Sequence, residues 1–239
     1  MKELLTSNLM RQLQLFDDLI LPMRCEHDEA LERFENLKSR YTVIGTDEAG
    51  RGSLAGPVVA AAVYLTDEQE ESLIAMGLKD SKRVSPNGRE KLFAAMNESG
   101  VMWRAYMGDN LRVDRDNVLN ASLWTMGKSV TRVARKLSGK IACVVDGNEK
   151  ITELDIPQWV LIRADDLIPC VSAASIVAKV IRDRLMVILS ERYPGYELER
   201  NKGYPTQRHI NALRGLGLSE IHRRTFCRRI MNTDRRYKF

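Results

Sequence analysis

Three apolar segments of the chain end in acidic side chains, and these acids have the types and spacing that could do chemistry. They are, in chain order, Asp47 with Glu48, Asp146, and Asp165 with Asp166. Carboxylates at the end of a buried strand are costly unless they are neutralised, and a bound divalent cation can hold two of them close together. The pattern therefore predicts a site for a hard cation such as Mg²⁺ or Mn²⁺.

Acids at strand ends have a second interpretation, because such residues often only begin a turn. Repetition at three strand ends favours the cation site, since ligands of open α/β sheets commonly bind there. Consecutive strand residues point to opposite faces, so Asp47 and Glu48 both reach the site only if the backbone turns between them. We expect Gly50 and Gly52, which follow directly, to allow that turn.

The cysteines and histidines show no metal-binding pattern of their own. They lie far apart, at Cys25, Cys143, Cys170, Cys227, His27, His209 and His222. Without close pairs they argue against a zinc site and indicate free thiols.

Short apolar segments rich in β-branched residues predict the strands that position these acids. They lie at 41–47, 57–65, 101–108, 141–146 and 159–162. Apolar residues at helical spacing predict helices from about Asp116 to Leu137, from near Ser172, at 206–213 and at 219–229, and Ser85 with Pro86 marks the start of another. Strands followed by alternating helices and strands predict an α/β fold with a mixed central sheet flanked by helices.

The two ends of the chain differ from this central part. Apolar residues at helical spacing predict an N-terminal helical appendage over residues 1–40, and residues 41–239 are expected to form the main domain, ending in basic helices. Residues 222–238 hold seven Lys or Arg and one acid, Asp234. Such a patch either contacts a phosphate backbone or is solvated surface.

Length and hydropathy limit the class of protein. A chain of 239 residues with a net charge of +5 fits one soluble domain with a small appendage. The longest nearly apolar segment, Leu54–Leu65, is interrupted by Gly56 and Pro57 and is shorter than the roughly 18 residues that span a bilayer. The first residues lack the apolar core of a secretory signal, so no membrane association and a cytoplasmic location are expected.

Five blocks of the sequence resemble bacterial ribonuclease HII, of the type 2 ribonuclease H family, in order and spacing. They are DEAGRGSLAGPVVAAAV from Asp47, GLKDSKRVS from Gly77, VVDGN from Val144, SAASIVAKVIRD from Ser172 and NKGYPT from Asn201. Five ordered blocks are far more specific than a single glycine motif. The resemblance covers nearly everything from Tyr41 to Arg229 and implies a ribonuclease H-like fold.

The resemblance also implies a catalytic set and a reaction. The set is Asp47, Glu48, Asp146 and Asp165, of which the first three would be metal ligands. The family often has Lys-Gly-Asp around the fourth acid, whereas this chain has Arg163, Ala164 and Asp165. Counting back from the SAAS block selects Asp165, with Asp166 as the alternative.

The implied substrates are RNA–DNA hybrids and duplex DNA with embedded ribonucleotides. Two Mg²⁺ or Mn²⁺ ions would support hydrolysis to 5′-phosphate and 3′-hydroxyl ends. The resemblance implies that Gly50, Arg51 and Gly52 bring the backbone within reach of a 2′-hydroxyl, because glycine lets the chain approach closely. Tyr204 would stack on the sugar of the adjacent deoxynucleotide; its alternative is a turn residue packed before Pro205.

Several side chains are candidate phosphate contacts. Ser175, Lys179 and Arg182 share one helix face at i, i+4 and i+7, opposite the apolar face, which predicts either a phosphate-facing stripe or a solvated surface. Lys79 and Lys82 are further candidates, each also compatible with plain surface positions.

Other functions fit the pattern less well. Gly50, Gly52 and Ala55 match G-x-G-x-x-A of dinucleotide-binding proteins, but that motif should open a helix, whereas a strand follows here. A non-catalytic nucleic-acid-binding module and another nuclease of the same fold are the remaining alternatives. The presence of all four acids and of the Gly-Arg-Gly segment favours a ribonuclease. The sequence indicates no protein partner.

Overall fold

The computed structural model describes residues 22–78 and 84–232. The strands are β1 (Thr42–Ala49), β2 (Val58–Tyr64), β3 (Met102–Gly108), β4 (Ile141–Asp146) and β5 (Gln158–Leu161). The helices are α2 (His27–Lys38), α3 (Asp67–Ala75), α4 (Pro86–Glu98), α5 (Asn110–Asp116), α6 (Val118–Ala134), α7 (Ala164–Leu167), α8 (Pro169–Arg192), α9 (Leu198–Asn201), α10 (Gln207–Leu216) and α11 (Arg224–Asn232). Each predicted strand is therefore present, with ends that differ from the predicted ones by two residues at most.

Within the described residues, five strands form one mixed sheet in the order β3-β2-β1-β4-β5. β2 is antiparallel to both β1 and β3, whereas β4 runs parallel to β1, and β5 runs parallel to β4. This arrangement confirms the predicted mixed sheet with flanking helices. Because β1, β4 and β5 are parallel neighbours, their carboxyl ends meet at one edge of the sheet, as the acids at those ends require.

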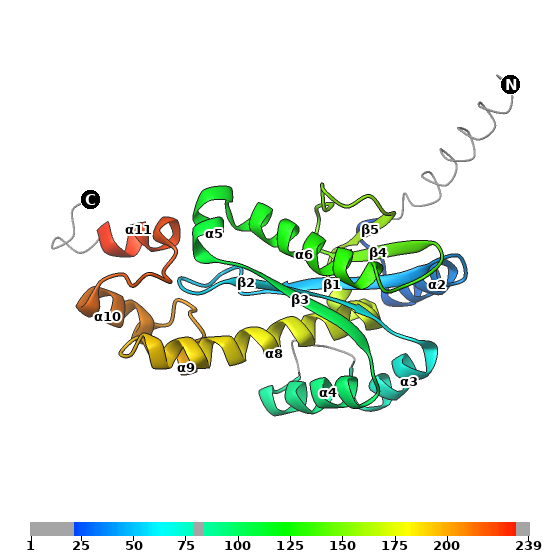
Figure 1. Ribbon diagram of the computed structural model, residues 1–239, viewed down its shortest axis with the longest axis horizontal. Helices are drawn as coiled ribbons and strands as arrows, with labels where there is room; N and C mark the ends of the chain where they lie inside the picture. Colours follow the sequence, from blue (N-terminus) through cyan, green and yellow to red (C-terminus); the bar gives the residue numbers. More distant parts are fainter. Residues whose placement is uncertain (1–21, 79–83, 233–239) are drawn as a thin grey trace, which may run out of the picture.

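Helices cover both faces of the sheet, with α8 and α4 on one side and α5 and α6 on the other (Figure 1). Strand alternation divides the core accordingly. Val43 of β1 packs in the cluster that contains Ile176 of α8, while Ile44 packs in the cluster that contains Met126 of α6. The central strands β1, β2 and β4 are thus buried on both faces.

A third apolar cluster joins the turn after β1 to the C-terminal helices. Leu54 packs with Met186 of α8 and with Leu213 of α10. Its backbone N–H donates to the Gly203 carbonyl (2.7 Å), and its carbonyl accepts from the Arg223 N–H (2.8 Å). The segment that carries the Gly-Arg-Gly motif is therefore held by residues about 150 positions away in the chain.

Some helices differ from the sequence-based expectation. The helix expected from about Asp116 to Leu137 is present as α6, which begins at Val118. Asn117, with a φ of 64°, separates it from α5, and its side-chain oxygen caps α6 at the Asn120 N–H. The short helices α3, α5, α7 and α9 were not predicted. Of the N-terminal appendage, α2 lies in the described residues and buries Phe34 in the core, while residues 1–21 lie outside them.

Two other expectations concern membranes and thiols. Among the described residues, we find no helix that meets the length and hydropathy needed to cross a bilayer. All four cysteines lie in the described part of the chain and none is in a disulfide.

Gly45 sets the distance between β1 and α8. A Cβ atom at this position would lie 2.4–2.6 Å from backbone atoms of Cys170 and Val171. We predict that Gly45→Ala lowers the free energy of unfolding by about 1–3 kcal/mol, because backbone atoms cannot move aside. Urea unfolding measures the change. Gly215→Ala is the control, since nothing lies within 4 Å of its added Cβ; an equal effect of both substitutions would contradict this explanation.

Candidate active site

Asp47 and Asp146 lie level with each other at the carboxyl ends of adjacent parallel strands. The last register pair between β1 and β4 is Thr46 with Val145, and each acid comes one residue later. β5 reaches the same level, because Asp146 pairs with Leu161. The strands predicted to end in acids are therefore neighbours, as the cation-site hypothesis requires.

Asp165 joins this group from α7, which follows β5 directly. Its backbone N–H donates to Asp146 Oδ1 (3.4 Å), and its residue is only 1% exposed. Asp166 behaves differently, because its carboxylate pairs with the Arg163 guanidinium at 2.7 Å. The structure thus brings Asp165 toward the other acids and directs Asp166 to an arginine.

Asp47 and Glu48 lie on opposite sides of the strand, and the backbone does not turn between them. β1 continues through Ala49, which still pairs with Val59. Asp47 consequently faces α8, where Lys179 Nζ lies 4.0 Å from its Oδ2, whereas Glu48 accepts from Arg51 Nη1 at 3.2 Å. The prediction that the backbone turns between Asp47 and Glu48 is therefore wrong. Glu48 instead lies close enough to Asp146 for their charges to interact.

Ser175 and Lys179 do not form the solvent-facing stripe that their helical spacing predicted. Ser175 is fully buried, and its hydroxyl hydrogen-bonds to both Asp47 and the Lys179 ammonium. The first half of α8 is buried on nearly all sides, so its polar residues face the acids rather than solvent. The side chain of Lys179 keeps 25% of its surface exposed and supplies the positive charge nearest to Asp47.

Arg182 is also placed differently from the prediction. It is 1% exposed, and its guanidinium donates to the Pro57 carbonyl (3.1 Å) and to Ser53 Oγ (2.8 Å). A buried guanidinium with these partners is not presented to a phosphate, which corrects the expected contact. Its bonds instead support the turn after β1. Lys79 and Lys82 lie outside the described residues.

Burial and neighbouring negative charge raise the pKa values of two of the acids, Asp47 and Glu48. Burial raises the pKa of Asp47, and Asp165 adds to the shift while Lys179 opposes it. Burial together with the negative charge of Asp47 raises the pKa of Glu48 to about 8, although Arg51 opposes this change. Deprotonating both acids is therefore costly until positive charge arrives.

These residues fit a divalent cation in chemistry, because hard oxygen donors converge from three neighbouring elements. Within the described ranges, no three His, Cys, Asp or Glu side chains already stand as ligands around one point. We expect ion binding to draw the carboxylates together.

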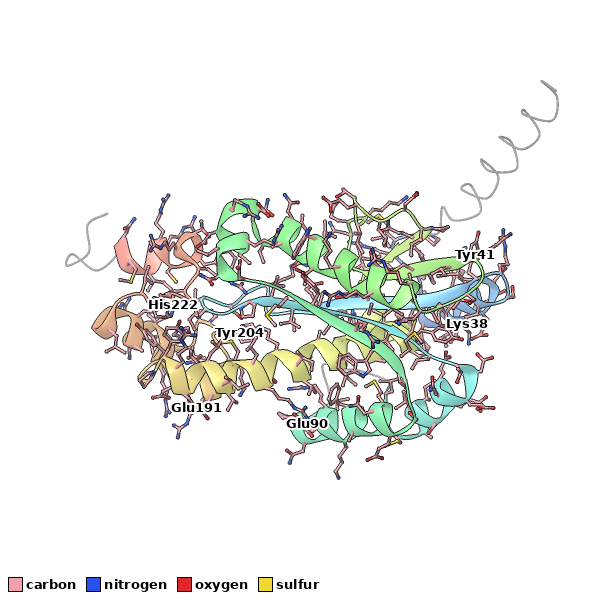
Figure 2. All side chains as sticks on the ribbon, viewed as in Figure 1. Lys38, Tyr41, Glu90, Glu191, Tyr204 and His222 are labelled. Carbon is pink, nitrogen blue, oxygen red and sulfur yellow. The ribbon has the colours of Figure 1, made fainter. Side chains whose placement is uncertain are left out.

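Of the predicted substrate-contact residues, the Gly-Arg-Gly segment follows Asp47 and Glu48 closely in the chain. Gly50 has a φ of 94°, a conformation that favours glycine, and Arg51 keeps 48% of its side-chain surface exposed. Tyr204, 41% exposed, lies near His222 on the C-terminal side of the molecule (Figure 2). The structure thus brings the Gly-Arg-Gly segment and an exposed aromatic ring to the same side of the sheet, since Gly203 bonds to Leu54.

Comparison with known proteins shows the same family that the sequence blocks resemble. The model of the family described as Ribonuclease HII matches residues 44–229. The chain belongs to the ribonuclease HII family. A ribonuclease HII of Acaryochloris marina is 45% identical over 185 residues, which are 77% of this chain and 92% of the relative. As a member of this family, the chain is a metal-dependent endonuclease.

Solved structures share the fold. The ribonuclease H2 of Pyrococcus horikoshii superimposes with a TM-score of 0.63 at 25% identity, covering 80% of this chain and 97% of that one. A Bst-RNase HIII crystallised in complex with Mn²⁺ gives a TM-score of 0.66 at 19% identity, covering 82% and 71%. The first structure supports the ribonuclease H-like fold class directly, and the second supports it through fold alone.

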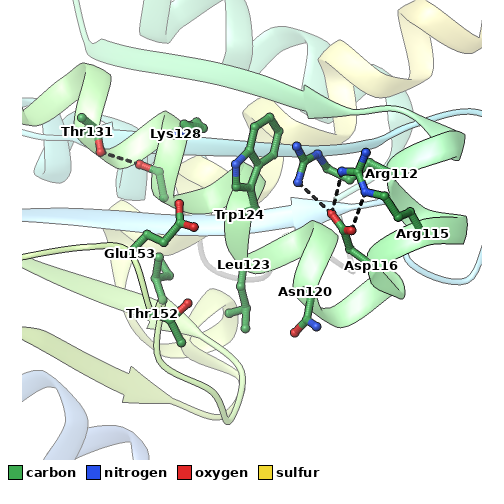
Figure 3. Close-up of a pocket in the computed structure, with 12 residues that line it drawn as sticks. Arg112, Arg115, Asp116, Asn120, Leu123, Trp124, Lys128, Thr131, Thr152 and Glu153 are labelled. Atoms are coloured by element: carbon green, nitrogen blue, oxygen red, sulfur yellow. Dashed lines mark hydrogen bonds and ion pairs between the residues drawn. The ribbon is translucent and has the colours of Figure 1, made fainter.

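A cavity elsewhere on this ribonuclease HII family member contains none of the four acids. It has a volume of about 420 Å³ and lies between α6 and the loop after β4 (Figure 3). Asp116 holds both Arg112 and Arg115, and Arg112 stacks 3.6 Å from the Trp124 ring centroid. Arg112, Arg115 and Asp116 are thus engaged with one another, and the cavity is separate from the four acids.

Three buried residues near the site escaped the sequence analysis. Arg223 belongs to the basic tail but is fully buried, so this part of the tail is not a DNA-facing surface; Arg224, Arg228 and Arg229 are exposed. His209 and His222 lie with their Nε2 atoms 3.1 Å apart, and burial lowers the pKa of His222 to about 4. Nothing in their spacing signalled this, because charged and polar residues are usually exposed.

We predict that stability of the metal-free protein falls as pH rises from about 5 to about 8. Folded Glu48, with its pKa near 8, keeps a proton that the unfolded chain has lost above its ordinary pKa of 4.5. The unfolded state binds fewer protons across this window, so the free energy of unfolding decreases with pH. Thermal melts in a chelator test this for the wild type against Glu48→Gln, which lacks the group.

The difference between these two proteins isolates Glu48 from other titrating residues. Excess Mn²⁺ should remove the decrease, because a cation favours the ionised carboxylates and releases their protons. The same pH dependence in the wild type and in Glu48→Gln would show that Glu48 does not carry the effect.

Proposed function

We propose that the chain hydrolyses the RNA strand of RNA–DNA hybrids and cuts on the 5′ side of single ribonucleotides embedded in duplex DNA. The products would carry 5′-phosphate and 3′-hydroxyl ends. The observation that carries the proposal is the pairwise proximity of four acids next to the Gly-Arg-Gly segment. Asp47 interacts with Glu48 and Asp165, and Asp146 interacts with Glu48 and Asp165. The similar proteins include a ribonuclease HII, a ribonuclease H2 and a ribonuclease HIII, and the last of these was crystallised in complex with Mn²⁺.

The acids would act as ligands of two divalent ions, Mg²⁺ or Mn²⁺. Asp47, Glu48 and Asp146 would hold the ions, and Asp165 would complete the negative site. The chemistry that such ions supply when bound is activation of a water molecule and stabilisation of the leaving 3′-oxygen. Lys179 would balance the charge of Asp47 and keep that carboxylate oriented.

The neighbouring residues would read the substrate. Backbone groups of Gly50, Arg51 and Gly52 would contact the 2′-hydroxyl, which distinguishes RNA from DNA. Tyr204 would stack on the sugar of the next deoxynucleotide with its exposed ring. Together they would recognise a junction between a ribonucleotide and a deoxyribonucleotide.

We predict that Asp146→Asn abolishes cleavage in Mg²⁺ and in Mn²⁺ while the fold remains intact. The amide removes a charged ligand, and loss of a metal ligand costs several orders of magnitude in rate. Single-turnover cleavage of a duplex with one ribonucleotide measures the loss. Asp166→Asn is the matched control, because its carboxylate is held by Arg163. Near wild-type turnover by folded Asp146→Asn would exclude the metal role.

Tyr204 also allows a prediction about selectivity between two substrates. Tyr204→Ala should lower cleavage of a duplex with one ribonucleotide more than cleavage of a long RNA–DNA hybrid, since only the former presents a single junction. Both substrates are compared at one salt concentration, because phosphate contacts are salt-sensitive. Equal losses on the two substrates would rule out junction recognition by Tyr204.

A further inference from the structure

Two buried guanidinium groups lie beneath the loop of residues 50–57. Arg182 is 1% exposed and Arg223 is 0% exposed. Fully buried arginines are rare unless they are paired with carboxylates. Here the hydrogen bonds of both groups go to neutral acceptors, namely the Ser53 hydroxyl and the backbone carbonyls of Arg51, Ala55, Gly56 and Pro57.

The two side chains hold the 50–57 loop at both ends. Arg223 Nη1 donates to the Arg51 carbonyl (2.9 Å), and its Nε and Nη2 both donate to the Gly56 carbonyl (3.1 and 2.9 Å). The Arg182 guanidinium donates to the Pro57 carbonyl (3.1 Å), to the Ser53 hydroxyl (2.8 Å) and to the Ala55 carbonyl (3.4 Å). Each guanidinium group is planar and carries several donors in fixed positions, so the two groups restrain the loop backbone more strictly than single hydrogen bonds would.

The same support reaches Tyr204. The Arg182 guanidinium carbon lies 5.3 Å from the centroid of the Tyr204 ring, within the range of a cation–π contact. A Cβ atom on Gly203 would lie 2.4 Å from the Ala55 carbonyl oxygen, so the segment before Tyr204 packs directly on the loop. His209 Nδ1 also binds the Tyr204 carbonyl at 3.0 Å.

Gly50 shows how closely the loop rests on this support. A Cβ atom there would lie 2.0 Å from Arg182 Nε. The backbone of the Gly-Arg-Gly segment and the ring of Tyr204 therefore contact one guanidinium from two directions. Moving Arg182 would shift both elements relative to each other.

We propose that Arg182 and Arg223 are positioning residues that set the distance between the 50–57 loop and Tyr204. This inference rests on the proposed function, in which the loop reads a ribose and Tyr204 stacks on the next deoxyribose. Neither arginine touches the reacting atoms. Their buried charges repel each other and are costly to desolvate, and burial lowers the pKa of Arg223 to about 10. The arginine pair thus lowers stability but fixes the spacing between the 50–57 loop and Tyr204.

The test uses the ratio of kcat/KM on a duplex with one ribonucleotide to kcat/KM on a long RNA–DNA hybrid. Arg182→Lys and Arg223→Lys keep the charge but lose the fork. We expect each to lower the ratio about 10- to 100-fold, because misplacement by about 1 Å is costly in an oriented site. Arg184→Lys, on the exposed side of α8, and Arg224→Lys are the matched controls and should leave the ratio unchanged.

A double substitution separates positioning from general damage. If Arg182 acts through Tyr204, Arg182→Lys should lower the ratio no further than about twofold in a Tyr204→Ala background. If Arg182 had a purely structural role, Arg182→Lys would lower kcat/KM equally on both substrates, or its effect on the ratio would add fully to that of Tyr204→Ala. The proposal would be overturned if both lysine variants kept the wild-type ratio, or if the effects of Arg182→Lys and Tyr204→Ala on the ratio were fully additive.

Two controls keep the outcomes distinct. A wild-type enzyme that fails to cut the single-ribonucleotide duplex refutes the proposed function, whatever the variants do, whereas unchanged ratios in active variants refute only the arginine pair's role. If the lysine variants do not fold by circular dichroism, Ser53→Ala carries the test, because it removes one acceptor of Arg182 without altering a charge. A lowered ratio in that variant supports the proposal, and an unchanged ratio overturns it.

Discussion

Negative charge crowded at the carboxyl ends of β1 and β4 is the constraint on which the rest of the site depends. Asp47 is 4% exposed, so it cannot rely on water to disperse its charge, and Asp146 lies level with it on the neighbouring strand. The protein supplies partial compensation through Lys179 and Arg51. That compensation is incomplete, since burial and the negative charge of Asp47 still raise the pKa of Glu48.

Helix α8 serves both halves of the site from one rigid element. Its early turns present Ser175 and Lys179 to Asp47, and its later turns present Arg182 to the 50–57 loop. Gly45 lets this helix lie directly on β1, which fixes the acids relative to the loop. The acids and the 50–57 loop therefore share a single support, and sites built on regular elements hold their geometry more precisely than sites built on loops alone.

Much of the fold and the position of the acids could be predicted from the sequence. Strand composition gave β1 to β5 nearly to the residue, and Asp47, Asp146 and Asp165 follow those strands at their ends. These features depend on local periodicity, which a sequence displays directly. The ordered blocks from Asp47 to Thr206 predicted the family to which the family model and the relatives also assign the chain.

Tertiary structure alone decided which way several of these residues face. The spacing of Ser175, Lys179 and Arg182 defines one helix face, but periodicity does not say whether that face meets solvent, and here it meets acids and loop carbonyls. The same holds for Arg223, which a basic tail would expose and which the turn after β1 buries. The sequence determined the elements and the chemistry of their ends, because both are local; burial depends on contacts between distant segments, and only the folded chain creates them.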